Sequence, residues 1–328
     1  MTPPTFSIII PSHNRPQMLR RVVTSALAQT DPDFEIWVID DASEPPAAQA
    51  IPDLLTDARV QVHRQEPNGG AAVARNTGAS LARGEVLVFV DDDDEITPDY
   101  LAGVRAVFDS SPPRVGWVGG SIRHLRDTAH GVETVRDEHW AENLAGPGRA
   151  HEKLMATPTT RFCFSGLAVK RVAFEAVDGF DTAYRCSEDR EFLMRLSGKS
   201  DVAPLHAVGV LVHHHDGPKL NRYSKKMAES YRRIVETHYT QISQNPQALM
   251  AFAYKTAWLH YQVGENKTAR RFAKMALKSR PISGRTWTLI ASYEIGRTHG
   301  SEIHTGISTW VKTLKRSLGR ELARGAKS

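Results

Sequence analysis

Four consecutive aspartates, Asp91, Asp92, Asp93 and Asp94, directly follow the apolar run Val86–Val90. The run is short and rich in β-branched residues, which predicts a buried strand. Carboxylates this close raise one another's pKa unless a cation neutralises them. Mg²⁺ or Mn²⁺ commonly uses one or two carboxylates and completes its shell with water and substrate phosphate. The pattern therefore predicts a metal–diphosphate site at the strand's carboxyl end. The alternative is a solvated acidic turn that caps the helix expected after Pro98.

A second acidic strand end lies 50 residues earlier, where the strand Phe34–Ile39 runs into Asp40 and Asp41. We expect the order β-α-β-β-α-β from the elements Phe6–Pro11, 18–28, 34–39, 60–63, 71–82 and 86–90. That order predicts an α/β fold with a mostly parallel, doubly wound sheet, in which both acidic clusters face one crevice. An ordinary cap remains the alternative for Asp40 and Asp41.

Composition limits the class of protein. A chain of 328 residues can hold one large α/β domain and an appendage, and 41% hydrophobic residues are typical of soluble proteins. No window approaches ~18 uninterrupted apolar residues, and no signal peptide is evident. The two cysteines, Cys163 and Cys186, lack metal-type spacing, which favours a reducing, cytoplasmic location.

The charge is distributed unevenly along the chain. Residues 1–220 contain 22 Lys and Arg against 31 Asp and Glu, whereas residues 221–328 contain 20 against 6. A basic tail on an acidic body indicates an anionic surface or partner for the tail.

The loop after the first strand excludes several nucleotide-binding classes. Its sequence, Pro11 to Arg15, is neither G-x-G-x-x-G nor a P-loop, and the turn Asn68–Gly70 has the wrong context for either. This argues against dehydrogenases, NTPases and sugar-nucleotide pyrophosphorylases.

Four segments together resemble the successive signatures of family 2 glycosyltransferases: Ser7–Arg15, Val38–Ser43, Ala74–Asn76 and Phe89–Glu95. The resemblance covers about residues 5–220. It implies a GT-A fold and inverting transfer from a nucleoside-diphosphate sugar, with a UDP-sugar favoured and with Mn²⁺ or Mg²⁺ as cofactor.

The same resemblance assigns donor contacts by position. Pro11, Arg15 and Asp41 would touch the nucleoside with Asp40 beside them, and Arg75 would lie near the base or the diphosphate. Gly166 would let the backbone approach the donor sugar, although a bulge or tight packing explains a strand glycine equally well.

Metal contacts follow from the DxD motif of the resembled family. Asp93 would be the direct metal ligand, Asp91 would face ribose or metal, and Asp92 would belong to the donor site. His215, after the last strand, would contact the metal or the diphosphate. His213 points the same way by the two-residue period, and an exposed polar edge is the alternative for both.

The catalytic base is expected at the start of a helix. Phe192, Leu193 and Leu196 have helical spacing, which places Glu188 and Asp189 in the first turn. Simple complementarity with the helix dipole would explain acidic residues there. The resemblance instead implies that this pair is the catalytic motif, with Asp189 as the base.

The remaining segments give a domain plan. Residues 115–160 are expected to be irregular and to shape the acceptor side. We expect a catalytic domain over 1–222, divided near 110 into donor and acceptor halves, and a basic helical region over 223–328. Residues 249–281 resemble a tetratricopeptide-type hairpin. Residues 307–322 form a basic amphipathic pattern that could lie on an anionic membrane or dock on the body.

We therefore expect a metal-dependent glycosyltransferase that forms one bond per encounter, because the Gln-x-x-Arg-Trp motif of processive relatives is absent. Its acceptor would be a glycan or lipid-linked hydroxyl used in cell-surface polysaccharide or glycoconjugate synthesis. It would be cytoplasmic, peripheral on the inner face of the plasma membrane, with no specific nucleic-acid partner. The alternative is a non-catalytic sugar-nucleotide or anionic-polymer binding protein whose basic tail binds the partner.

Overall fold

The computed structural model describes residues 4–128, 131–214 and 224–280. Contacts divide the chain into two compact units, one made of residues 1–154 and 159–219 and the other of residues 155–158 and 220–328. The first unit contains the sheet, and the described part of the second is helical.

The strands of the first unit are β1 (Phe6–Ser12), β2 (Phe34–Asp41), β3 (Val60–Gln65), β4 (Val86–Phe89), β5 (Asp94–Ile96), β6 (Val115–Thr128), β7 (Gly131–Glu138), β8 (Leu167–Lys170) and β9 (Asp201–His214). Its helices are α1 (Pro16–Leu27), α2 (Ala71–Leu81), α3 (Tyr100–Ser110), α4 (Arg149–Ala156, of which residues 155 and 156 belong to the second unit), α5 (Arg171–Glu175) and α6 (Glu188–Ser197). Short 3₁₀ segments are η1 (Ala47–Ala50), η2 (Leu54–Thr56) and η3 (Trp140–Asn143).

All the described strands belong to one sheet of order β3-β2-β1-β4-β8-β6-β9-β5, with β7 paired to β6. The pairs β3-β2, β2-β1 and β1-β4 are parallel, as predicted for this half of the chain. Beyond β4 the sheet is mixed, because β8 runs antiparallel to both β4 and β6 while β6 and β9 are parallel. The predicted α/β class is confirmed.

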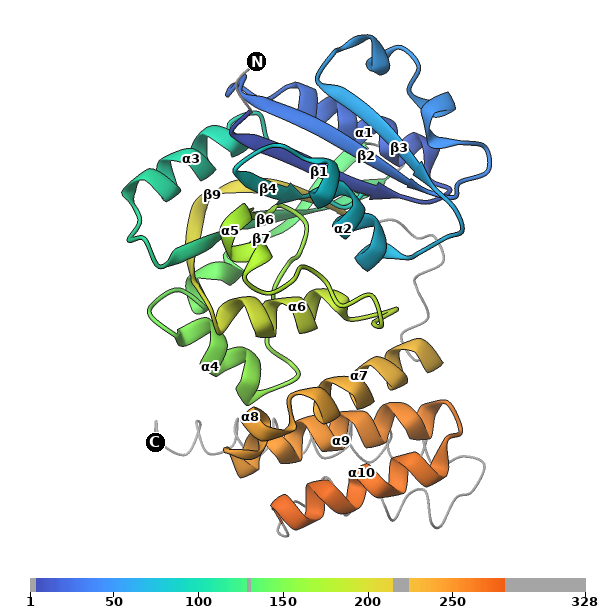
Figure 1. Ribbon diagram of the computed structural model, residues 1–328, viewed down its shortest axis with the longest axis vertical. Coiled ribbons are helices and arrows are strands. Elements are labelled where there is room, and N and C mark those ends of the chain that lie inside the picture. The colour runs from blue at the N-terminus through green and yellow to red at the C-terminus, as the bar shows by residue number, and fades with distance from the viewer. Residues whose placement is uncertain (1–3, 129–130, 215–223, 281–328) are drawn as a thin grey trace, which may run out of the picture. The chain divides into compact units, whose positions relative to one another are not determined.

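The order of the strands reverses at β1, which pairs with β2 on one side and β4 on the other. Right-handed crossovers then place the connecting helices on opposite faces. Figure 1 shows α1 behind β1 and β2 and α2 in front of them. A reversal of this kind opens a crevice at the carboxyl ends of the flanking strands. Here those ends carry the loop that contains Arg15 and the four aspartates.

The central strands are buried on both faces, which explains their continuous apolar runs. Ile8, Ile9 and Ile10 of β1 and Leu87 and Val88 of β4 have no solvent exposure. Each such side chain stabilises the fold by about 1.5–3 kcal/mol. This rigid centre fixes where the polar strand ends lie.

The expectation that residues 115–160 are irregular is wrong. Residues 115–128 form the long strand β6, which pairs with β7, β8 and β9. Its glycines conceal the strand pattern, because glycine weakens a strand unless close packing requires it. A Cβ on Gly116 would lie 2.6 Å from Ser200, and one on Gly119 would lie 2.6 Å from the ring of Trp140.

The second unit contains α7 (Lys225–Thr237), α8 (Tyr239–Ser243), α9 (Pro246–Gln262) and α10 (Asn266–Ser279). Helices α9 and α10 pack along each other, as expected for a helical hairpin (Figure 1). Ala228 and Tyr231 of α7 form a buried cluster with Leu259 of α9. Within the described ranges, no helix is both long and apolar enough to cross a membrane. The predicted terminal helix, residues 307–322, lies outside the described residues.

Candidate active site

The four aspartates bridge the end of β4 and the start of β5. Asp92 and Asp94 are each only 6% exposed, and the helix that follows has no side-chain cap from Asp99. The side chains of Asp91 and Asp93 are 36% and 29% exposed, so the turn is partly buried and differs from the alternative of a solvated helix cap. Burial raises the pKa of Asp92 to about 6. Burial and the nearby charges of Asp91 and Asp93 raise the pKa of Asp94 well above its usual range.

Arg15, in the loop after β1, holds the tip of this acidic turn. Its Nη1 donates to Asp92 Oδ1 at 2.9 Å and to Asp93 Oδ2 at 2.8 Å. Arg21 of α1 donates to the Asp93 carbonyl at 2.7 Å. Two cations from the β1–α1 segment thus offset part of the charge at the end of β4.

Asp91 is tied to a different part of the chain. Its backbone N–H donates to Ser165 Oγ at 3.1 Å, and its Oδ1 accepts from Arg75 Nη2 at 2.8 Å. Arg75 Nη1 donates to Glu188 Oε1 at 2.9 Å. One guanidinium of α2 therefore joins the end of β4 to the first residue of α6.

An aromatic cluster supports this guanidinium. The Arg75 guanidinium carbon lies 4.5 Å from the ring centroid of Phe164 and 5.5 Å from that of Phe180. The Phe180 ring also stacks on Phe192 of α6 at 4.3 Å. Cations over ring faces are attracted by the ring quadrupole, more strongly where water is excluded. The cluster thus holds both the arginine and the helix.

Asp189 occupies the first turn of α6, as the sequence predicts, beside Glu188. Ser187 precedes the helix at φ 57°, and Asp189 Oδ1 accepts from the backbone N–H of Arg190 at 2.6 Å. Burial, helped by the charge of Glu188, raises the pKa of Asp189 to about 6, although Arg75 and Arg190 oppose the rise. A carboxyl group with this pKa changes protonation state just below neutral pH.

Asp40 and Asp41 differ, although they are adjacent. Asp40 accepts hydrogen bonds from the backbone N–H groups of Ser43 and Ala47 at 2.8 and 2.9 Å and pairs with Arg64 at 2.9 Å. These bonds use both carboxylate oxygens. Asp40 therefore holds the turn after β2, and its predicted contact with the donor stays a prediction.

Asp41 holds the glycine turn before α2. Its Oδ1 accepts from Gly69 N at 2.6 Å and its Oδ2 from Gly70 N at 2.8 Å. The Gly69 carbonyl in turn accepts from Arg185, in the loop before α6. The segments that contain Asp41 and Asp189 thus meet at this turn.

Sequence reasoning missed several residues that line these segments. His13 Nδ1 lies 2.7 Å from the Asp41 carbonyl, and Asn68 Nδ2 donates to the same oxygen at 3.0 Å. Arg21 and Ser165, which contact the aspartate turn, were missed as well. The polar turn at Asn68–Gly70 was the one signal in the sequence that could have indicated these contacts. It does not match a phosphate-binding loop, so comparison with phosphate-loop patterns alone does not find it.

Comparison with known sequences decides the family. The Glycosyl transferase family 2 profile matches residues 7–177, which include Asp41, Arg75 and Asp93 and end before α6. The chain belongs to glycosyl transferase family 2. It is therefore a glycosyltransferase, and the alternative of a non-catalytic binding protein is set aside.

This glycosyltransferase is 24% identical over 288 residues to an uncharacterised glycosyltransferase of Haemophilus influenzae, covering 87% of this chain and 94% of the relative. Among solved structures, it matches S. aureus TarS 1–349 in complex with UDP-GlcNAc with a TM-score of 0.58 at 18% identity, covering 84% and 92% of the two chains. It matches the mannosyltransferase PcManGT of Pyrobaculum calidifontis, in complex with GDP-Man and Mn²⁺, with a TM-score of 0.53 at 18% identity, covering 95% and 88%. These likenesses confirm the GT-A fold.

Pro11, His213 and His215 are the remaining predicted contacts. Pro11 is the penultimate residue of β1, half-buried beside Ile39 of β2. His213 Nε2 lies 2.6 Å from Glu95 Oε1, so this histidine faces β5. His215 lies outside the described residues. In the part of the chain that the structure describes, no group of three or more His, Cys, Asp and Glu residues could hold a metal ion.

Gly166 of the glycosyltransferase is required by packing. Its φ is +72°, and a Cβ there would lie 2.2 Å from Val210 Cγ2. Its carbonyl accepts from the buried Tyr100 hydroxyl at 2.5 Å. The close approach is thus to β9 and α3, and a contact with the donor sugar stays a prediction.

Gly166→Ala is expected to lower the free energy of unfolding by roughly 1–3 kcal/mol, because the added Cβ clashes and φ is strained. Urea unfolding measures the change. Val210→Ala should cost less in the Gly166→Ala chain than in the wild type, because it removes the clashing methyl group. If Val210→Ala lowered the free energy of unfolding equally in the wild type and in Gly166→Ala, the clash between the added Cβ and Val210 would not occur.

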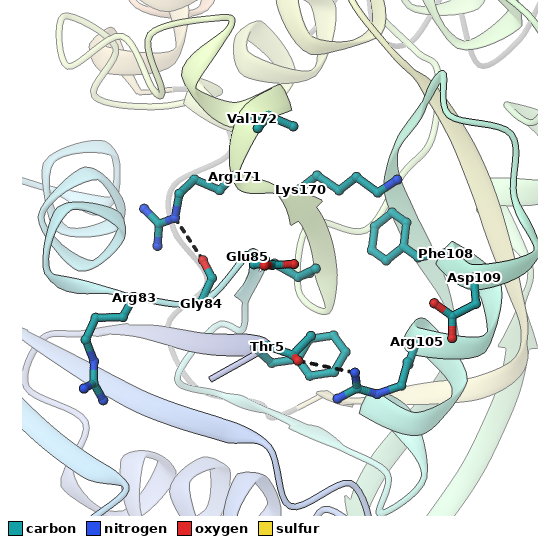
Figure 2. Close-up of a pocket in the computed structure, with 12 residues that line it drawn as sticks. Thr5, Arg83, Gly84, Glu85, Arg105, Phe108, Asp109, Lys170, Arg171 and Val172 are labelled. Atoms are coloured by element: carbon teal, nitrogen blue, oxygen red, sulfur yellow. Dashed lines mark hydrogen bonds between the residues drawn. The ribbon is translucent and has the colours of Figure 1, made fainter. Parts of the chain in front are cut away.

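A cavity of about 540 Å³ lies at the opposite ends of β1 and β4 from the aspartates (Figure 2). Its cations already have partners, since Arg171 donates to the Gly84 carbonyl at 2.9 Å and Arg105 to Asp31 at 2.7 Å. It contains none of the predicted site residues. Volume alone therefore does not locate the chemistry of this glycosyltransferase.

Proposed function

We propose that the protein carries out metal-dependent, inverting transfer of a sugar from a nucleoside-diphosphate sugar, with UDP as the favoured nucleotide. The acceptor is a hydroxyl group of a glycan or lipid-linked molecule used in cell-surface polysaccharide or glycoconjugate synthesis. The observation that carries the proposal is the shared guanidinium of Arg75. It lies within 2.9 Å of both Asp91 and Glu188, so the DxD motif and the start of α6 border one site.

Asp189 is the general base in this proposal. Its carboxylate takes the proton of the acceptor hydroxyl as that oxygen attacks the anomeric carbon. The new glycosidic bond forms while the bond between the anomeric carbon and the phosphate oxygen breaks, and the nucleoside diphosphate leaves with the bonding electrons. Attack from the face opposite the leaving group inverts the configuration. A base whose pKa is about 6 is ionised at neutral pH and still accepts protons effectively.

The donor is proposed to bind between the carboxyl ends of β1, β2 and β4. In this proposal Pro11 and Arg15 would contact the donor from β1 and its following loop, and Asp41 with the Asn68–Gly70 turn would contact it from β2 and the start of α2. Support for a UDP-sugar comes from the TarS structure, which contains UDP-GlcNAc on the same fold.

Asp93 and Asp91 are the ligands proposed for Mn²⁺ or Mg²⁺, because hard divalent cations take carboxylate oxygen. Asp93 and Asp91 each have one oxygen hydrogen-bonded to an arginine, which leaves hard carboxylate oxygen for a cation whose other ligands are diphosphate and water. PcManGT was solved with Mn²⁺ and GDP-Man. A bound cation would stabilise negative charge on the departing diphosphate.

Thermal unfolding against a panel of nucleotide sugars, with and without Mn²⁺, tests the proposal. A UDP-sugar at saturating concentration with Mn²⁺ should raise the unfolding temperature by several degrees, because ligand at ~100 Kd stabilises by about 2.7 kcal/mol. The stabilising donor should then release UDP when an acceptor glycan is added. The proposal fails if no nucleotide sugar gives a shift that depends on the metal.

A further inference from the structure

The side chain of Arg75 occupies an unusual position for a surface helix. It is only 5% exposed, and both of its terminal nitrogens donate to carboxylates, one to Asp91 and one to Glu188. The charge of Asp189 also acts on it. A buried cation thus stands among three carboxylates that come from two segments about 100 residues apart.

The two partners depend on Arg75 to different degrees. Asp91 follows a fully buried strand, and its N–H is also bonded to Ser165. Glu188 is the first residue of α6, and that helix has no side-chain cap on its amino end. Loss of the guanidinium would therefore disturb the start of α6 more than the end of β4.

We propose that Arg75 is a positioning residue, which acts through Glu188 to hold the first turn of α6, and with it Asp189, against the DxD strand end. This inference rests on the proposed function, because it concerns the placement of the proposed base. It differs from the role that the resemblance gives to this position, which is a contact with the nucleotide base or diphosphate.

The chemistry of arginine explains why this residue suits the position. The planar guanidinium contacts two carboxylates at once and stacks on the rings of Phe164 and Phe180. A lysine ammonium is a point charge that cannot reproduce the fork or the stacking. Arg75→Lys keeps the charge and loses the geometry, so it isolates the positioning role.

Arg75→Lys is expected to lower kcat roughly 10–100-fold, the usual range for residues that orient active groups. Affinity for UDP with Mn²⁺ should stay close to wild type. The uncharged variant Arg75→Gln should also move the acid limb of the pH–rate profile to higher pH. The groups that face Asp189 are Glu188, Arg75 and Arg190, and Arg75 is one of the cations that lower its pKa.

Arg195→Lys is the matched control. Arg195 is on the same helix, pairs with Glu191 at 2.7 Å and lies over the ring of Phe192. Arg195→Lys should lower the unfolding temperature and keep kcat, and the uncharged Arg195→Gln should leave the acid limb where it is. A similar loss of kcat and shift of the limb in this control would mean that Arg75 matters only for stability.

A double-mutant cycle tests the route through Glu188. Glu188→Gln should lower kcat in the wild type and cost little more in the Arg75→Gln chain, because the contact is already lost. Additive losses would overturn the inference, and so would an Arg75→Lys chain that keeps its kcat and loses UDP affinity. If Asp189→Asn keeps full activity, the assignment of Asp189 as the base in the proposed function fails, while sugar transfer itself stands. If Asp189→Asn is inactive and Arg75→Lys is normal, only the positioning inference fails.

Discussion

Asp189→Asn is expected to lower kcat by roughly 10²–10⁴-fold, the usual contribution of a positioned proton acceptor. The amide keeps the size of the side chain and can still accept the hydrogen bond from the Arg190 N–H. It cannot take a proton. Affinity for UDP and Mn²⁺ should therefore stay near that of the wild type, and turnover should be lost. Binding by calorimetry and release of UDP measure the two quantities on the same samples.

The pH dependence of the wild type has a definite sign. Burial raises the pKa of Asp189 to about 6, so kcat/KM, which reports the base of the free enzyme, should rise with pH through about 6 and then level off. The same shift makes ionisation of Asp189 destabilising, because the folded chain holds its proton more tightly than the unfolded chain. Stability from this group is complete below the unfolded pKa near ~3.9 and is lost as pH rises through about 6. Asp189→Asn should consequently unfold at the same or a higher temperature at pH 8.

Asp178→Asn provides the control, since it makes the same chemical change at an exposed loop residue ahead of α6. That residue has φ 55°, a conformation that Asn tolerates well. Its kcat should match the wild type. Wild-type turnover in Asp189→Asn would remove Asp189 as the base, and reduced turnover in both variants would indicate a general disturbance of the loop and helix.

The parallel half of the sheet could be predicted because its strands are buried on both faces and end in polar turns. The apolar runs of β1, β2 and β4 were interpreted as buried strands. The apolar residues after Ser187 have the spacing of a helix, which predicted α6. Strand β6 could not be predicted, because the close packing that requires its glycines involves residues distant in sequence, such as Trp140 and Ser200. Local pattern therefore fails where tertiary packing sets the residue type.

The candidate site likewise contains features that the sequence predicts and features that depend on tertiary contacts. The acidic residues could be found from the sequence because carboxylates cluster at strand ends. The pairing of Arg75 with Glu188 could not, since 113 residues separate them and no period connects them. The separate roles of Asp40 and Asp41 were also hidden, because adjacent residues of a strand point to opposite faces and only the fold decides which turn each of them holds.

Asp93→Ala is expected to remove most of the dependence of nucleotide binding on Mn²⁺, with a loss of metal affinity of at least ~10–100-fold. This large effect is expected because the protein would supply few of the metal ion's ligands. If the cation is held by one or two carboxylates and the diphosphate, each carboxylate carries a large share of the binding. Titration of UDP in the presence and absence of Mn²⁺ measures the dependence. Asp109→Ala, an exposed acidic residue beside the cavity at the other end of β4, is the control.

Binding of UDP without metal shows whether Asp93 is a metal ligand or an acidic residue that only supports the turn. Asp93→Ala removes a negative charge from the site and leaves Arg15 with Asp92 alone as its salt-bridge partner. Metal-free UDP, which is an anion, should then bind as well as before or somewhat better, because the uncompensated positive charge increases. Binding with Mn²⁺ should fall at the same time, so the two affinities converge. If both affinities fell together, Asp93 would be supporting the fold of the turn rather than holding the cation. Whether the affinity for metal-free UDP rises or falls in Asp93→Ala therefore decides the role of Asp93.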